Sequence, residues 1–189
     1  MNGYERMTDD ELYGSFLRGD TTAYDQLMIR YGDALLLYLS GYLHDWHEAE
    51  DHMIEAFARI MAKRPSIGEG NFKAYLFRTG RNLALRFFER RSRMQTFSVE
   101  SMEVDLPDEA SVAQNLLRSE RQQTLSRCID RIESELREAL WLVYVDELSY
   151  AQAASVMGVK VKRIDRLLYR GKQQMRIELA KEGITNAYE

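Results

Sequence analysis

The sequence predicts an all-α protein with two helical domains, an N-terminal helix bundle and a C-terminal helix-turn-helix domain, joined by a flexible linker. Only two prolines occur in 189 residues, and good helix formers such as Leu, Ala, Arg, Glu and Met are frequent. Apolar residues recur at helical spacing in several segments that begin with capping residues. This periodicity fails only over 96–113, an acidic stretch around Pro107. We therefore expect domains at 1–95 and 114–189, with the linker between them.

Three helices are expected before residue 65. Thr8 and Glu11 form a capping-box pattern, which predicts a first helix ending near Arg18. A second helix is expected to be capped within 22–25, with an apolar stripe of Leu27, Met28, Tyr31, Leu35, Tyr38, Leu39 and Tyr42. Asp45 is expected to cap a third helix, whose buried face comprises Ala49, Met53, Ala56, Phe57, Ile60 and Met61. These stripes predict a bundle.

A fourth helix is expected after the Pro- and Gly-containing break at 65–70. Residues 71–93 carry seven basic residues against a single acid, Glu89. Its apolar stripe comprises Phe72, Tyr75, Leu76, Leu83 and Phe87, and Arg78, Arg81, Arg86 and Arg93 fall largely outside it. A cationic face with flanking aromatic residues suits a polyanion whose bases can be unstacked. An ordinary solvated amphipathic helix is the alternative.

The net charge of −4 conceals a strong segregation of charge along the chain. Residues 1–58 have twelve acids and three bases, a net charge of −9, whereas residues 59–95 have ten bases and two acids, a net charge of +8. Residues 96–157 return to −7, with twelve acids and five bases, and residues 158–189 reach +4, with eight bases and four acids. Salt screens charges beyond about 8–10 Å, so these local blocks matter more than the total. Two separated basic segments indicate two contacts with one polyanion.

The C-terminal part has the pattern of a helix-turn-helix. Two helical segments are expected first, one marked by Leu116, Leu117, Leu125, Ile129 and Ile132 and one over 136–145. A capping box at Ser149 then opens a short helix that ends at Gly158. A longer helix, from Val161 to about Leu179, follows, and Val161, Ile164, Leu167 and Leu168 are expected to pack inward. The second helix of this motif enters the major groove of DNA. The residues available for phosphates and base edges are Lys160, Lys162, Arg163, Arg166, Arg170 and Lys172. A helical hairpin with a basic surface is the alternative.

Three motifs, in order, resemble those of the extracytoplasmic-function sigma factors, the two-domain initiation factors of bacterial RNA polymerase. EAED at 48–51 with EAF at 55–57 resembles the polymerase-binding motif of that family. FKAYLFR at 72–78 with RNLA at 81–84 resembles its promoter-melting, minus-ten-reading helix. The segment 147–158 with LYR at 168–170 resembles its minus-thirty-five-reading helix-turn-helix. The similarity covers residues 8–180. Ile54, where the family usually has Gln, and Asp165, in the reading helix, depart from the pattern.

The resemblance implies a sigma factor that binds core polymerase and promoter DNA to direct transcription initiation. It implies core binding by Asp51, Glu55 and Phe57, and minus-ten contacts by Lys73, Tyr75, Arg78, Arg81, Asn82 and Arg86. It also implies minus-thirty-five contacts by the six basic residues of the last helix, capture of an unpaired base near the loop 65–71, and an anti-sigma factor as partner. The competing hypothesis is a sigma-like adaptor that binds only proteins; Ile54 and Asp165 favour it.

Other functions are poorly supported by the residues. Phosphate loops, GxSxG elbows and HExxH motifs are absent from the sequence, so we expect no enzyme and no cofactor. His44, His47 and His52 lie near acids, but no closed ligand set is visible and we expect no metal. No run of eighteen apolar residues and no signal peptide is found, and Cys128 is the only cysteine. The chain is therefore expected to be cytoplasmic, without membrane insertion.

Overall fold

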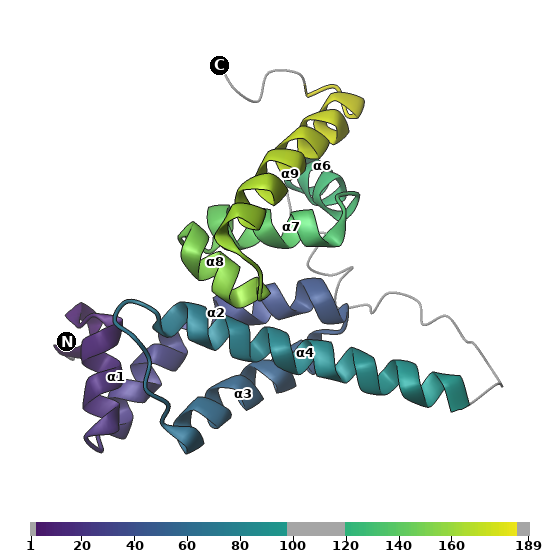
Figure 1. Cartoon of the computed structure of the whole chain (residues 1–189). Helices are drawn as coiled ribbons and strands as arrows, with labels where there is room; N and C mark the ends of the chain where they lie inside the picture. The colour runs from purple at the N-terminus through teal and green to yellow at the C-terminus, as the bar shows by residue number, and fades with distance from the viewer. Residues whose placement is uncertain (1–2, 98–119, 185–189) are drawn as a thin grey trace. The chain divides into compact units, whose positions relative to one another are not determined.

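The computed structural model describes residues 3–97 and 120–184, and every regular element in these two ranges is helical (Figure 1). This confirms the all-α fold class. The chain divides into two compact units, one on each side of the segment 98–119. Of the expected linker, only residues 96–97 are described, and they end a helix; 98–113 lie outside the described residues, as do Leu116 and Leu117. The expected domain boundaries therefore stay predictions.

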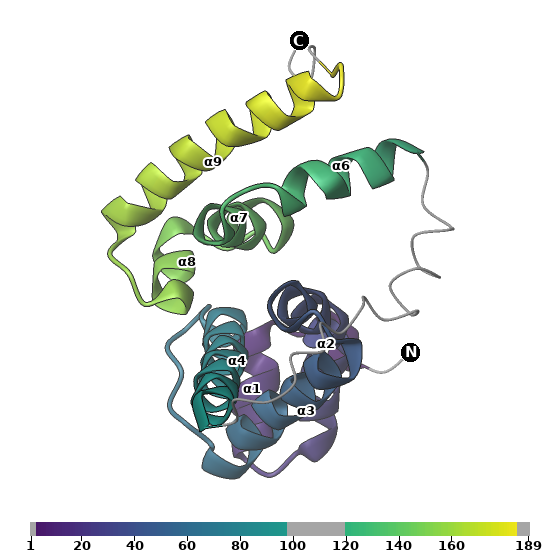
Figure 2. The same cartoon turned by 90° about the vertical axis from the view of Figure 1, so that its right-hand side faces the viewer.

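The first unit contains a short 3₁₀ turn, η1 (Gly3–Arg6), and four α-helices: α1 (Asp9–Leu17), α2 (Thr21–Leu43), α3 (Trp46–Lys63) and α4 (Phe72–Phe97). Figure 2 views the unit from its end and shows these helices gathered around a common centre, with the start of α4 beside α1. The C-terminal part of α4 extends beyond its neighbours in Figure 1. The expected bundle is present, and its longest helix carries the basic segment.

Buried aromatic residues form the centre of the first unit. Phe16 and Tyr24 have ring centroids 4.5 Å apart, and those of Tyr13 and Phe72 are 5.3 Å apart. The Tyr24 hydroxyl donates a hydrogen bond of 2.7 Å to the Phe57 carbonyl, and burial raises the pKa of Tyr24 above its ordinary value. Aromatic side chains bury large apolar areas, so this cluster fixes α3 and α4 against α1 and α2.

Side-chain caps begin the first three α-helices. The capping box of Thr8 and Glu11 is present, as is the cap made by Asp45. The expected cap within 22–25 is wrong: α2 begins at Thr21, and the Asp20 side chain accepts from the N–H groups of Thr22 and Ala23. Gly19, at φ 108°, makes the preceding turn, and the Tyr4 hydroxyl donates to Asp20. A carboxylate satisfies the free N–H groups of a first turn well.

The second unit consists of α6 (Glu120–Asp130), α7 (Ser134–Leu140), the π-helical turn η2 (Trp141–Val145), α8 (Tyr150–Met157) and α9 (Val161–Lys181). The expected capping box at Ser149 opens α8, and Gly158 ends it in the left-handed conformation, at φ 68°. Helix α9 packs on α7 so closely that a Cβ on Gly171 would lie 3.0 Å from Leu140 Cδ1. The α8–turn–α9 segment is the expected helix-turn-helix.

Some residues expected inside are exposed. Ile164, Leu167 and Leu168 are buried, but Val161 is 48% exposed. Val161 is the first residue of α9 and lies almost a full turn before Ile164. Ile164 is the first side chain of this helix that packs inward. Met61 and Leu125 are likewise partly exposed, at 40% and 44%.

Candidate nucleic-acid interfaces

Helix α4 presents cationic and aromatic side chains opposite its buried face. Tyr75, Arg78, Asn82 and Arg86 are three or four residues apart, so they share one face. Asn82 and Arg86 are exposed, and the Arg78 guanidinium lies over the Tyr75 ring, 5.1 Å from its centroid. A cation over an aromatic face is favourable, and both side chains of this pair are half-buried. This arrangement can contact a phosphate and stack on a base.

Lys73 and Arg81 are half-buried on α4. The Lys73 ammonium lies over the rings of Phe77, at 5.4 Å, and Tyr31, at 5.8 Å. Burial, together with a hydrogen bond to Asp9, raises the pKa of Tyr31, so this hydroxyl stays neutral beside the lysine. The structure therefore brings four of the six residues predicted on α4 onto one face and leaves Lys73 and Arg81 outside it; within that face Asn82 and Arg86 are exposed, whereas Tyr75 and Arg78 are half-buried.

The loop 64–71, which leads into α4, is fastened to α1 by three contacts. The Asp10 carboxylate accepts from the Gly70 N–H, with oxygen–nitrogen distances of 2.9 and 3.0 Å. The Tyr13 hydroxyl donates to the Pro65 carbonyl at 2.7 Å, and the Arg64 guanidinium lies 5.0 Å from the Phe16 ring centroid. Sequence reasoning identified this break but not its partners on α1. The loop conformation therefore depends on α1.

Helix α3 carries the residues expected to bind polymerase, and the structure separates them. Asp51 is exposed, and Glu55, also exposed, pairs with Arg59 one turn later. Ile54 lies between them in sequence and is 50% exposed. Phe57, in contrast, is 1% exposed. This corrects the assignment of Phe57 as a contact residue: its side chain belongs to the core, where it supports the helix from within.

The three histidines do not gather around a common point with acidic side chains. Among the residues that the structure describes, no group of three or more His, Cys, Asp or Glu side chains is arranged to hold a metal. His52 Nδ1 lies 2.7 Å from the Glu48 carbonyl, and its ring packs edge-on against Phe87, with centroids 5.2 Å apart. His44 ends α2 in the left-handed conformation. His52 thus joins α3 to α4.

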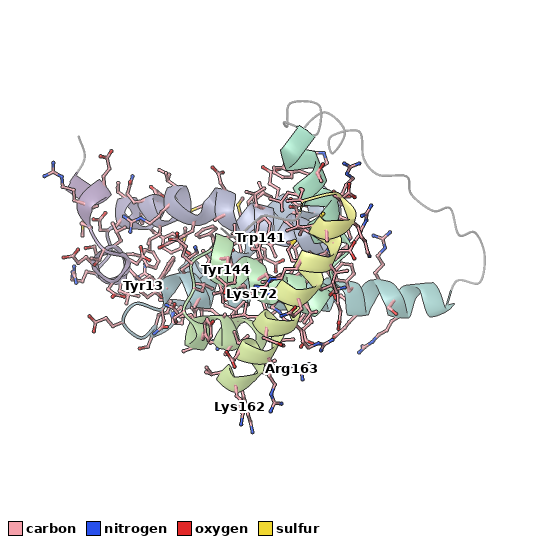
Figure 3. All side chains as sticks on the ribbon, turned by 90° about the horizontal axis from the view of Figure 1, so that it is seen from above. Tyr13, Trp141, Tyr144, Lys162, Arg163 and Lys172 are labelled. Atoms are coloured by element: carbon pink, nitrogen blue, oxygen red, sulfur yellow. The ribbon has the colours of Figure 1, made fainter. Side chains whose placement is uncertain are left out.

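Helix α9 gathers cations at its N-terminal end. All six predicted basic residues are exposed. A hollow of about 400 Å³ is lined by Lys160, Lys162, Arg163, Arg166, Leu167 and Arg170. Figure 3 shows Lys162 and Arg163 projecting from this end, whereas Lys172 lies further along the helix, 4.8 Å from the Tyr144 ring centroid. The structure therefore places five of the six predicted residues in one cationic surface and Lys172 outside it.

Two acidic residues at the start of α7 pair with this surface, and sequence reasoning missed both. Glu135 accepts from Arg163 Nε at 3.0 Å and from Arg163 Nη2 at 2.7 and 2.8 Å. Glu133 accepts from Arg170 Nη2 at 3.1 Å. Arg163 and Arg170 are thus exposed but not without partners. The only sequence signal is the acidic run 133–138 beside a basic helix, and it does not identify the pairs.

Within the described ranges, the helices are either too short or too polar to cross a membrane.

Two family models match the chain. The model of sigma-70 region 2 matches residues 27–94, which include all of α3, all but the end of α4 and the part of α2 from residue 27 onward. The model of sigma-70 region 4 matches residues 122–175, which include α8, the turn after it and most of α9.

Curated relatives match over most of the chain. It is 30% identical to the ECF RNA polymerase sigma factor SigE of Mycolicibacterium smegmatis, over 89% of this chain and 67% of that protein. It is 29% identical to the RNA polymerase sigma-H factor of Pseudomonas aeruginosa, over 87% and 90%. It is 27% identical to the ECF RNA polymerase sigma-E factor of Escherichia coli K12, over 89% and 93%.

Solved structures share the fold at lower identity. The sigma factor RpoE, in complex with the anti-sigma factor NepR from Bartonella quintana, matches with a TM-score of 0.65 and 22% identity, over 83% of this chain and 96% of that one. CnrH, in complex with the cytosolic domain of CnrY, matches with a TM-score of 0.65 and 20% identity, over 92% and 97%.

Proposed function

The chain belongs to the extracytoplasmic-function sigma factors of the sigma-70 family, and we propose that its two units read the two elements of a bacterial promoter for core RNA polymerase. The observation that carries this proposal is a pair of cationic helix surfaces, one in each unit, each opposite a buried apolar face. Arg78 and Arg86 mark the first surface, and Arg163 and Arg166 mark the second. Two separate phosphate-binding surfaces suit one extended DNA duplex.

In this proposal, α4 and the loop 64–71 act at the minus-ten element. The face with Tyr75, Arg78 and Arg86 contacts the strand whose bases leave the stack, and the loop holds one of them. Taking a base out of the duplex costs a few kcal/mol, so an aromatic and cationic surface must compensate for lost stacking. The cation over the Tyr75 ring supplies both properties in one place.

Helix α9 is proposed to enter the major groove of the minus-thirty-five element. Its N-terminal residues Lys160, Lys162 and Arg163 are exposed, as a recognition helix requires. Arg163 and Arg166 are three residues apart and reach base edges, while Arg170 and Lys172 contact phosphates. Asp165 lies between the two reading arginines and can accept a hydrogen bond from the amino group of cytosine.

The exposed surface of α3 around Asp51 and Glu55 is proposed to bind core polymerase, which carries out the chemistry; the chain itself is not proposed to be an enzyme. We also propose that it acts in the cytoplasm, where an anti-sigma factor holds it inactive. Purification from the native organism should recover a partner other than polymerase. Recovery of polymerase alone under all growth conditions would contradict this regulation.

The decisive experiment is run-off transcription with the full chain, bacterial core polymerase and a promoter library. We expect transcripts that require both the chain and core enzyme and that share an upstream and a downstream sequence element. The adaptor hypothesis, favoured by the exposed Ile54, predicts protein binding without transcripts. Binding to isolated DNA would not separate the two, because any cationic surface binds DNA non-specifically.

A further inference from the structure

We propose that Glu135 is a positioning residue that orients Arg163 to read guanine in the upstream promoter element. This inference rests on the proposed function of α9. Glu135 lies on α7 and contacts no base in this proposal. It acts through the guanidinium of Arg163, to which it is bound at 2.7, 2.8 and 3.0 Å.

The geometry of the contact determines which part of the arginine remains available. Glu135 Oε1 accepts from Nε and Nη2, at 3.0 and 2.7 Å, and Glu135 Oε2 accepts from the same Nη2 at 2.8 Å. Among the described residues, Nη1 of Arg163 has no hydrogen-bond or ion-pair partner, because all three bonds to Glu135 come from Nε and Nη2. Arginine has five N–H donors in a rigid planar fork. Nη1 is therefore still able to donate to the acceptors O6 and N7 of guanine.

Glu135 is held in place by a packed helix. It lies in the first turn of α7, where an acidic side chain is favourable. Its neighbour Leu136 is 2% exposed, and Ala139, one turn later, is fully buried. The Arg163 side chain is 57% exposed, against 33% for the Glu135 side chain. The carboxylate thus fixes an arginine that would otherwise sample many rotamers in solvent.

The second pair of the same surface provides an internal comparison. Glu133 contacts Arg170 through a single distance of 3.1 Å, with both side chains more than half exposed. One contact does not fix the plane of a guanidinium, whereas the Glu135 contact does. Glu133 therefore only reduces the positive charge of the surface. Replacing either acid should strengthen binding to all DNA sequences, but only Glu135 should affect the choice of base.

The expected effect follows from the entropy of the arginine side chain. Fixing such a long side chain costs enough free energy to change an equilibrium constant by roughly tenfold. When Glu135 is present, this cost is met before DNA binds. Without it, the preference of Arg163 for guanine over the other bases should fall by about tenfold.

The test uses holoenzyme reconstituted from the full chain and bacterial core polymerase. A duplex pool with a randomised upstream segment first yields the sequence preferred by the wild-type chain. Affinities for all its single-base variants are then measured for the wild type and for Glu135→Gln, Glu133→Gln and Arg163→Ala. Glutamine preserves the shape of the side chain and removes its charge. Urea unfolding of each variant confirms that the chain remains folded.

We expect Arg163→Ala to remove one guanine preference and Glu135→Gln to weaken that same preference about tenfold, with preferences elsewhere unchanged. Glu133→Gln should leave every preference intact. A guanine preference that stays unchanged in Glu135→Gln, with only a uniform gain in affinity like that of Glu133→Gln, would overturn the inference, as would an unaltered ranking in Arg163→Ala. If the wild-type holoenzyme selects no sequence at all, the proposed function fails as well.

Discussion

Replacing Asp10 with alanine tests whether α1 fixes the loop 64–71. Asp10 is sixty residues from Gly70 in sequence, yet both of its carboxylate oxygens lie within 3.0 Å of the Gly70 nitrogen. Gly70 has a φ of 67°, a conformation that few other residues adopt readily. The substitution removes the acceptor of this N–H and leaves α1 itself with its Thr8 cap.

The size of the effect follows from the type of bond and its exposure. A hydrogen bond to a charged group contributes about 1.5–3 kcal/mol to stability. Asp10 and Gly70 are both exposed, so water replaces part of the lost contact, and we expect a cost of about 1 kcal/mol. That cost corresponds to about a fivefold change in the equilibrium between the closed and the open loop. Asp10→Asn retains one acceptor oxygen and should show a smaller effect.

Amide hydrogen exchange of Gly70, measured by NMR on the full chain, reports this equilibrium directly. We expect exchange to be about five times faster in Asp10→Ala than in the wild type, with Asp10→Asn between them. Holoenzyme with Asp10→Ala should also discriminate less among unpaired bases of the downstream promoter element, tested on duplexes with mismatches there. Unchanged Gly70 exchange in Asp10→Ala would refute the claim that this contact fixes the loop.

Three further predictions follow from the described contacts. Asp51→Arg combined with Glu55→Arg should abolish co-purification with core polymerase. Helicity should be kept, because the exposed Glu55–Arg59 pair contributes only about 0.3–0.5 kcal/mol to stability. Retained core binding would exclude this surface. Lys172→Ala should weaken binding to all promoter variants alike and reduce the salt slope by about one; a changed base ranking would show that Lys172 reads sequence. Tyr24→Phe removes a buried hydrogen bond and should lower the free energy of unfolding by about 1 kcal/mol. Burial raises the folded-state pKa of Tyr24 above its ordinary value of 10.0, so the stability that this side chain provides is complete below pH 10 and is lost as the pH rises further. Urea unfolding at neutral and alkaline pH should therefore show a smaller fall in the free energy of unfolding for Tyr24→Phe than for the wild type. An equal fall in both would contradict this.

The sequence predicted features that depend on neighbours within one helical turn. Thr8, Asp45 and Ser149 cap their helices as expected, because each bonds N–H groups two or three residues ahead. The expected start of α2 was wrong because Asp20 and Thr22 are both capping residues two positions apart, and the helix begins after Asp20, the stronger cap of the two. Contacts between distant segments were not predictable: no periodicity joins Asp10 to Gly70 or Arg163 to Glu135.

Phe57 shows the limit of a family motif. The resemblance marked it as a contact residue, while its helical spacing marked it as core, and the structure favours the spacing. A motif records which residues occur together and does not separate those that touch a partner from those that support the surface. The burial of each side chain makes that distinction, and the helical spacing of the apolar residues had already predicted that Phe57 is buried.

The number of residues in the π-helical turn η2 determines how the helices that follow it are oriented relative to α7. Its Asp146 N–H bonds to the Trp141 carbonyl, five residues back, at 3.0 Å, so this turn holds one residue more than an α-helical turn. Deleting a single residue within 141–145 would restore regular α-helix and improve local geometry. It would also rotate everything that follows by about 100° relative to α7. Helix α9 would then no longer pack on α7 as it does now, so a shorter and locally more regular chain would lose the surface that we propose to read DNA.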